Sequence, residues 1–232
     1  PGLQRTSLRS PLKPRLDPGI ETPRLKALLA HGMGRTPASQ LLLAARLRHA
    51  GLSTHLFGYS ALASYRATVA RLVSRTLFVS SGQPYVLIGH SLGCVLIRAA
   101  LPDLAANPPS ACFFLAPPST ACRAARHFSR QRLFRLLTGE VGQLLANEAF
   151  MSSLPVPTVP TRIYAGTAGP RGPLSPFGNE PNDGILAVSE TVLAGIPSTL
   201  VPALHTFIMN SRVVATDIVR HALQPYATAH GV

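Results

Sequence analysis

Short runs of apolar residues alternate along the chain with segments of helical periodicity, and this alternation constrains the fold more than any other feature. The apolar runs predict strands at Leu25–Ala30, Thr54–Phe57, Tyr85–Gly89, Ala111–Ala116, Thr161–Ala165 and Thr199–Leu204. Strands that are apolar throughout and separated by helices are typical of a parallel sheet covered on both faces. The sequence therefore predicts one α/β domain with a mostly parallel central sheet and helices on both faces.

Helical periodicity fills most of the gaps between these runs. The predicted helices cover Pro37–Ala50, Leu62–Val73, Leu92–Leu101, Cys122–Ala146 and Ser211–Leu223. Ahead of the first strand, prolines alternate with arginines, which is typical of an irregular segment. We therefore expect a basic, proline-rich arm at residues 1–24 and one folded domain at residues 25–232.

The composition narrows the possible classes of protein. Hydrophobic residues make up 46% of the chain, enough for a sizeable core, and the net charge is +13. No run approaches the ~20 apolar residues that span a bilayer. The arginines are scattered, so the charge predicts non-specific attraction to anions and no specific nucleic-acid site. The positive charge leaves open a transient contact between this protein and an anionic membrane surface.

The cysteines favour a reducing compartment. Cys94, Cys112 and Cys122 are odd in number and irregular in spacing, which fits neither a disulfide framework nor a zinc site. Reduced thiols predict a cytoplasmic location, and no metal is expected. The segment after Pro1 lacks the apolar run that forms the core of a signal peptide. A leader ahead of Pro1 stays open, because the sequence does not begin with Met.

The segment that carries chemistry is Gly89-His90-Ser91-Leu92-Gly93. It lies between an apolar strand and an apolar helix, as the sharp turn of a nucleophile elbow requires. Glycines at both ends allow the backbone to turn without a Cβ clash, and the turn lifts a serine hydroxyl off the sheet. Ser91 is therefore the expected nucleophile, with the Leu92 N–H group at the start of the helix beside it.

A nucleophilic serine needs a base and an acid that orients the base. Their expected order is serine, acid and histidine, each just past the carboxyl end of a strand. His205 follows the last predicted strand and is the expected base. Asp183 is the expected acid, because its Asn-Asp-Gly turn holds a short carboxylate near the backbone. Glu180 is the main rival.

An oxyanion needs two fixed N–H donors. The loop after the first predicted strand contains His31, Gly32 and Met33. Gly32 permits close approach of the backbone, and Met33 would supply an N–H group to join that of Leu92. His31, Gly32 and His90 are the expected substrate-contacting residues.

From Leu25 to about Leu223 the chain resembles the α/β-hydrolase family, and more narrowly a group of small bacterial lipase-like and esterase-like hydrolases. The resemblance is carried by the stretches LLAHGMGRTPAS, VLIGHSLG, FFLAPP, NDGILAVSET and LHTFIM. It implies ester hydrolysis through an acyl-enzyme, without a cofactor, by Ser91, Asp183 and His205. Cys94 stands where relatives often have glycine, which leaves these three residues intact.

Phe128–Leu145 falls where such proteins insert a cap. Its mixture of arginine and apolar residues fits either a small basic lid or an ordinary helix that covers the sheet. The single apolar stripe favours the ordinary helix. We therefore expect a minimal cap or none, an open site, and short to medium acyl esters as substrates.

Two other functions stay open. An acyltransferase or a thioesterase would use the same three residues. A catalytically silent protein of this fold would instead bind anionic lipid or nucleic acid through its basic surface. The sequence does not reveal the oligomeric state.

Overall fold

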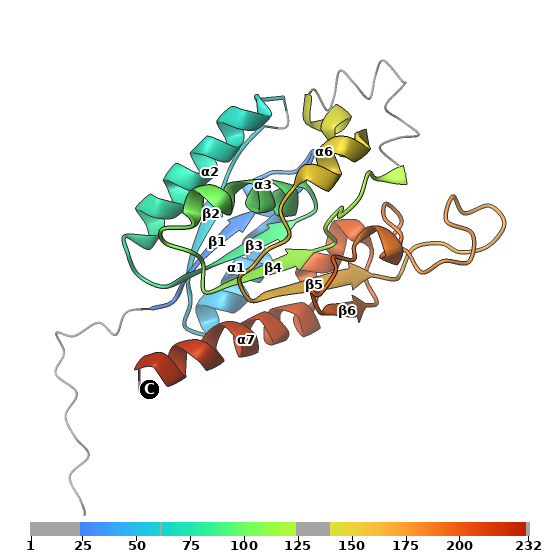
Figure 1. Ribbon diagram of the computed structural model, residues 1–232. Helices are drawn as coiled ribbons and strands as arrows, with labels where there is room; N and C mark the ends of the chain where they lie inside the picture. The colour runs from blue at the N-terminus through green and yellow to red at the C-terminus, as the bar shows by residue number, and fades with distance from the viewer. Residues whose placement is uncertain (1–23, 61, 124–139, 231–232) are drawn as a thin grey trace, which may run out of the picture.

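A six-stranded sheet, in the order β2-β1-β3-β4-β5-β6, forms the centre of the protein (Figure 1). The computed structural model describes residues 24–60, 62–123 and 140–230. Every pair of neighbouring strands is parallel, so the predicted α/β class is confirmed. The strands are β1 (Lys26–Ala30), β2 (Ser53–Phe57), β3 (Tyr85–His90), β4 (Ala111–Leu115), β5 (Thr161–Gly166) and β6 (Ser198–Val201).

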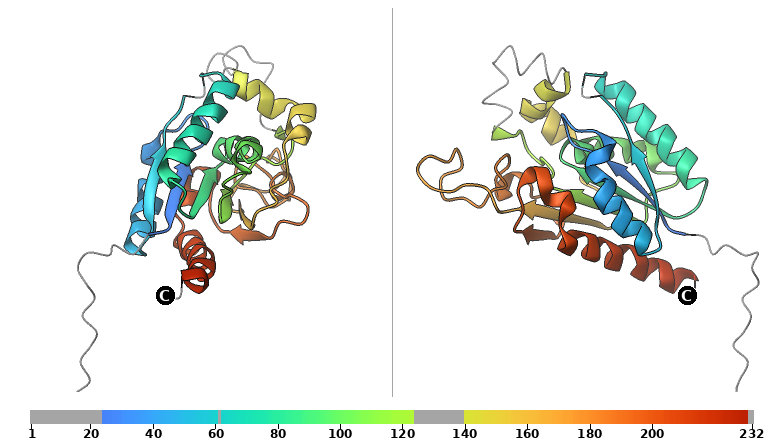
Figure 2. Two further views of the ribbon diagram at one scale, coloured as in Figure 1. Left: turned by 60° about the vertical axis from the view of Figure 1, so that its left-hand side comes forward. Right: turned by 180° about the vertical axis from the view of Figure 1, so that it is seen from behind.

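Helices cover both faces of this sheet (Figure 2). Helices α2 (Tyr65–Ser80), α3 (Leu92–Ala100) and α6 (Glu148–Ser153) bury apolar side chains against one face. Helices α1 (Leu41–His49) and α7 (Arg212–His230) pack against the other. The inner strands β1, β3, β4 and β5 are buried on both sides, which explains their mainly apolar sequences. The edge strands β2 and β6 are only partly buried and carry more polar residues.

Several element boundaries differ from the sequence-based expectation. Strand β6 ends at Val201 and not at Leu204, because Pro202 has no N–H group to continue the ladder. Helix α2 begins at Tyr65 and continues to Ser80, where Ser81 adopts a left-handed conformation with φ of 47°. Helix α6, which was not predicted, begins at Glu148 and is capped by Asn147, whose side chain accepts a hydrogen bond from the Phe150 N–H group.

Two predicted segments fall largely outside the described residues. The basic arm was placed at residues 1–24, of which only Arg24 is described. The choice between a lid and a sheet-covering helix concerns residues 128–145, of which 128–139 are not described. Among the helices that the structure does describe, none is long and apolar enough to cross a membrane.

Parallel topology brings three distant parts of the chain to one edge of the sheet. Ser91 follows β3, and the loops after β5 and β6 carry Asp183 and His205. The carboxyl ends of parallel strands all meet at the same edge, which is where ligands bind in open α/β sheets.

Candidate active site

Ser91 lies on a strained turn between β3 and α3. Its φ of 50° and ψ of −117° are unusual for a residue with a side chain, and such strain is found mainly at functional positions. The neighbouring glycines make the turn possible. A Cβ at Gly89 would lie 2.7 Å from the nitrogen of Cys94, and one at Gly93 would strike the carbonyl oxygen of Ala30. The local sequence therefore folds into a sharp strand–turn–helix, the geometry that a nucleophile elbow requires.

His205 is paired with Asp183. The Nδ1 atom of His205 lies 2.7 Å from Oδ2 of Asp183, and the His205 N–H group donates to the Asp183 carbonyl oxygen at 2.9 Å. Both residues are buried. Because a carboxylate only accepts, Nδ1 carries a hydrogen and Nε2 is left as the nitrogen that can take a proton. This is the orientation that a general base requires.

The loop after β5 fixes the carboxylate of Asp183. Its other oxygen, Oδ1, accepts hydrogen bonds from the N–H groups of Ile185 at 3.0 Å and Leu186 at 2.7 Å. The rival acid, Glu180, faces elsewhere and forms an ion pair with Arg123 at 2.9 Å. Of the two candidate acids, only Asp183 contacts the histidine among the described residues.

The oxyanion loop packs directly on the elbow. A Cβ at Gly32 would lie 3.2 Å from the Cβ of Ser91, so the absence of a side chain permits this approach. Leu92 is the first residue of α3, and its N–H group has no acceptor within the helix. Throughout the described residues, neither the Met33 nor the Leu92 N–H group has a hydrogen-bond acceptor. Both are free to bind a developing negative charge.

The remaining contact of a triad would join the Ser91 hydroxyl to Nε2 of His205. Within the ranges that the structure describes, the Ser91 hydroxyl forms no hydrogen bond. Such contacts are often long without substrate and shorten when it binds. His90, the neighbour of Ser91, has its ring centroid 5.0 Å from that of His205, so the segments that carry the candidate nucleophile and base are adjacent.

A sequence model of the alpha/beta hydrolase family matches residues 21–230, nearly the whole chain. The chain belongs to the alpha/beta hydrolase family. No curated protein matches its sequence.

Solved structures share the fold of this alpha/beta hydrolase at low sequence identity. The mature Bacillus licheniformis lipase BlEst2 superposes with a TM-score of 0.72 and 16% identity, over 89% of this chain and 96% of that one. A metagenomic carboxyl esterase gives a TM-score of 0.65 and 17% identity, over 91% of this chain and 78% of that one. The RedJ thioesterase of Streptomyces coelicolor superposes with a TM-score of 0.58 and 14% identity, over 90% of this chain and 91% of that one.

Tyr59 supports the oxyanion loop of this hydrolase through His31. The two rings are stacked with centroids 4.2 Å apart, and the Tyr59 hydroxyl donates to the His31 carbonyl oxygen at 2.6 Å. His31 is itself buried, and burial lowers its pKa. The side chain expected to contact substrate is thus held against Tyr59. Sequence reasoning missed Tyr59, although its place just after β2, at the catalytic edge, was a usable signal.

His90 is also enclosed, with only 2% of its surface exposed. Its Nε2 atom lies 2.9 Å from the carbonyl oxygen of His205, so Nε2 carries the hydrogen and donates it. Nδ1 is buried and has no hydrogen-bond partner in the described part of the chain. Burial, reinforced by the nearby His205, lowers the pKa of His90 well below its usual range. His90 is therefore neutral beside the candidate base.

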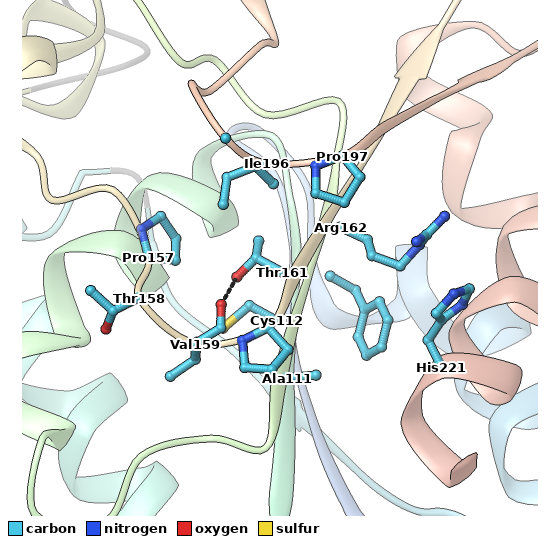
Figure 3. A pocket seen from close by; sticks show the side chains of 13 residues that line it. Ala111, Cys112, Pro157, Thr158, Val159, Thr161, Arg162, Ile196, Pro197 and His221 are labelled. Carbon is cyan, nitrogen blue, oxygen red and sulfur yellow. Dashed lines mark hydrogen bonds between the residues drawn. The ribbon is translucent and has the colours of Figure 1, made fainter. Parts of the chain in front are cut away.

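A separate cavity of about 620 Å³ opens at the opposite edge of the sheet (Figure 3). It lies at the amino ends of β4, β5 and β6, and its lining includes Cys112, Arg162, Ile196 and His221. No residue of the candidate triad lines it. The described residues also contain no cluster of histidine, cysteine and acidic side chains suited to a metal ion.

Proposed function

We propose that this alpha/beta hydrolase is a serine carboxylic-ester hydrolase that acts through Ser91, His205 and Asp183. The observation that carries the proposal is the buried His205–Asp183 pair, 2.7 Å apart, at the same sheet edge as the strained Ser91. A histidine oriented by a carboxylate is what converts a serine hydroxyl into a nucleophile.

The reaction proceeds in two halves. The Ser91 Oγ attacks the ester carbonyl while Nε2 of His205 takes its proton, and the N–H groups of Met33 and Leu92 bind the oxyanion. The protonated His205 then gives its proton to the leaving alcohol, which leaves an acyl-Ser91 ester. A water molecule, deprotonated by His205, attacks that ester, and His205 returns the proton to Ser91 Oγ as the carboxylic acid leaves. Asp183 stabilises the imidazolium in both halves.

The structural neighbours support an acyl-transfer chemistry of this kind. They include proteins named as a lipase and as a carboxyl esterase. Short to medium acyl esters are the proposed substrates, as expected for an open site with little or no cap. Thioester hydrolysis is a second candidate, because other neighbours are named as thioesterases. The same three residues would serve both reactions.

The test compares the wild type with Ser91→Ala on p-nitrophenyl esters of increasing acyl length. We expect turnover by the wild type and a loss of kcat of about 10⁴ or more in the variant. Circular dichroism should show both to be folded. Equal inactivity of the two folded proteins on every ester would reject the esterase proposal. Parallel assays with acyl thioesters, and with added alcohol as acceptor, separate hydrolysis of oxygen esters from thioesterase and transferase activity.

A further inference from the structure

One long part of the sequence contains no acidic residue. Residues 22–102 include no Asp or Glu but nine Lys and Arg residues. These cations are Arg24, Lys26, Arg35, Arg46, Arg48, Arg66, Arg71, Arg75 and Arg98. In the part of the chain that the structure describes, none of the nine forms an ion pair with a carboxylate. The excess charge is therefore concentrated in the half of the fold that contains β2, α1 and α2.

Strand β2 is an edge strand of the sheet (Figure 2). Several of these cations lie close to it. The Arg48 guanidinium donates to Oγ1 of Thr54 at 3.0 Å, and that of Arg71 donates to the Gly58 carbonyl oxygen at 3.3 Å. Arg75 lies close enough to His55 that its charge adds to the effect of burial in lowering the pKa of that histidine. Cationic groups from both flanking helices thus surround one five-residue strand.

A hollow of about 650 Å³ lies between this strand and α2. It is lined by Leu56, Phe57 and Gly58 and by α2 residues that include Arg71, Ser74 and Arg75. Arg71 and Arg75 are four residues apart on one helix face, where like charges repel each other. A bound anion would remove that repulsion, and the hollow leaves room for one beside both guanidinium groups.

The same helix face also exposes a large apolar side chain. Phe78 is 73% exposed. The Arg75 guanidinium lies over the Phe78 ring, 5.4 Å from its centroid. Arg71, Arg75 and Phe78 are spaced i, i+4 and i+7, so they share one face. Arginines combined with exposed apolar residues suit an anionic bilayer surface, which offers phosphates above an apolar layer. The phosphate backbone of duplex DNA would use the arginines and leave the Phe78 ring without an apolar partner.

We propose that the β2 flank, defined as Arg48, His55, Arg71, Arg75 and Phe78, binds the surface of an anionic phospholipid bilayer. Lipid phosphates lie against Arg71 and Arg75, and Phe78 enters the boundary between headgroups and acyl chains. This surface is separate from the residues of the triad.

The test is flotation of the full chain with lipid vesicles. We compare vesicles of phosphatidylcholine alone with vesicles that contain about 30% phosphatidylglycerol, at low and high salt. The wild type should bind only the anionic vesicles and lose binding at high salt. Arg71→Gln with Arg75→Gln should bind about thirtyfold more weakly, because each arginine near an anionic surface contributes about 1 kcal/mol. Phe78→Ser should weaken binding and leave its salt dependence unchanged.

The matched control is Arg171→Gln with Arg220→Gln, which removes the same charge from the β5 side of the fold. Arg171 contacts Thr167 after β5, and Arg220 pairs with Asp217, which binds β5. This control should bind anionic vesicles like the wild type. Equal weakening by both double variants would show that only net charge matters and would overturn the assignment, as would equal binding to neutral vesicles. If the wild type bound duplex DNA more tightly than anionic vesicles, and the Arg71/Arg75 variant lost that binding, the bilayer would be overturned as the partner. Thermal unfolding monitored by circular dichroism verifies folding independently of esterase activity.

Discussion

The Nε2 atom of His90 donates a hydrogen bond to the carbonyl oxygen of His205, 2.9 Å away across 115 residues of sequence. His90 directly precedes the nucleophile, and its ring also packs against the oxyanion loop. A Cβ at Gly32 would lie 2.7 Å from Nδ1 of His90. One buried side chain thus connects the elbow, the base and the oxyanion loop, which makes it a positioning residue for the proposed reaction.

Replacing His90 tests that role. His90→Leu removes the donor to His205, and we expect kcat to fall about tenfold to a hundredfold, the value of a lost buried hydrogen bond. KM should change little, because the side chain is enclosed, with only 2% of its surface exposed. His90→Gln keeps an N–H donor at a similar reach and should retain most of the activity. Steady-state kinetics on one p-nitrophenyl ester measures all three proteins.

The pH profile of His90→Gln separates positioning from acid–base catalysis. Since His90 is neutral, the acid limb of kcat/KM should reflect the free enzyme's base and stay in place in this variant. A displaced acid limb would mean that His90 titrates together with His205 and would contradict a purely positional role.

Tyr59→Phe should slow catalysis without changing the triad. The substitution keeps the ring stacked on His31 but removes the hydroxyl that donates to the His31 carbonyl oxygen at 2.6 Å. The oxyanion loop then loses one anchor, and we expect kcat to fall about tenfold at nearly constant KM. Tyr65→Phe is the matched control, because its ring packs edge-on against Phe150 and, among the described residues, its hydroxyl forms no hydrogen bond with the oxyanion loop. Equal activity of Tyr59→Phe and wild type would show that the loop holds its shape without this bond.

Asp183→Asn should abolish most activity, whereas Glu180→Gln should not. The amide keeps an oxygen for the Ile185 and Leu186 N–H groups but no longer stabilises an imidazolium, and the equivalent change in a known triad costs about 10⁴ in kcat. Glu180 pairs with Arg123, and hydrogen bonds from Ser189 and Arg123 lower its pKa. Its loss should affect stability only slightly. The reverse pattern in a side-by-side kinetic assay would assign the acid to Glu180.

The sequence predicted the parts of the fold that depend on local patterns. Apolar runs bounded by glycine or proline marked the six strands, and the elbow was recognisable because its two glycines and Ser91 lie within five residues. The end of β6 was misplaced because Leu204 continues the apolar pattern, whereas Pro202 interrupts the hydrogen bonding.

Contacts between distant segments were beyond this reasoning. Tyr59 meets His31 only because β2 pairs with β1, and His90 meets His205 only because β3 and β6 present their carboxyl ends at one edge. Asp183 and Glu180 are three residues apart, so spacing alone did not separate them. Their different partners, His205 and Arg123, depend on how the loop after β5 folds.

The buried histidines predict that stability falls in mildly acidic solution. Burial lowers the pKa of His31, His55 and His90 below the usual value of 6.5. As the pH falls below 6.5 the unfolded chain binds protons that the folded chain excludes, so the free energy of unfolding decreases. The decrease is up to about 1.4 kcal/mol per pH unit for the fully buried His90 and smaller for the more exposed His55. Glu180 and Asp217 have lowered pKa values, so their protonation affects the free energy of unfolding mainly below pH 4.5. Urea unfolding between about pH 7.5 and about pH 5 therefore measures mainly the contribution of the histidines. His90→Gln should show a shallower dependence on pH than the wild type, whatever its absolute stability. Parallel curves for the two proteins would show that His90 accepts its proton in the folded state as readily as in the unfolded chain.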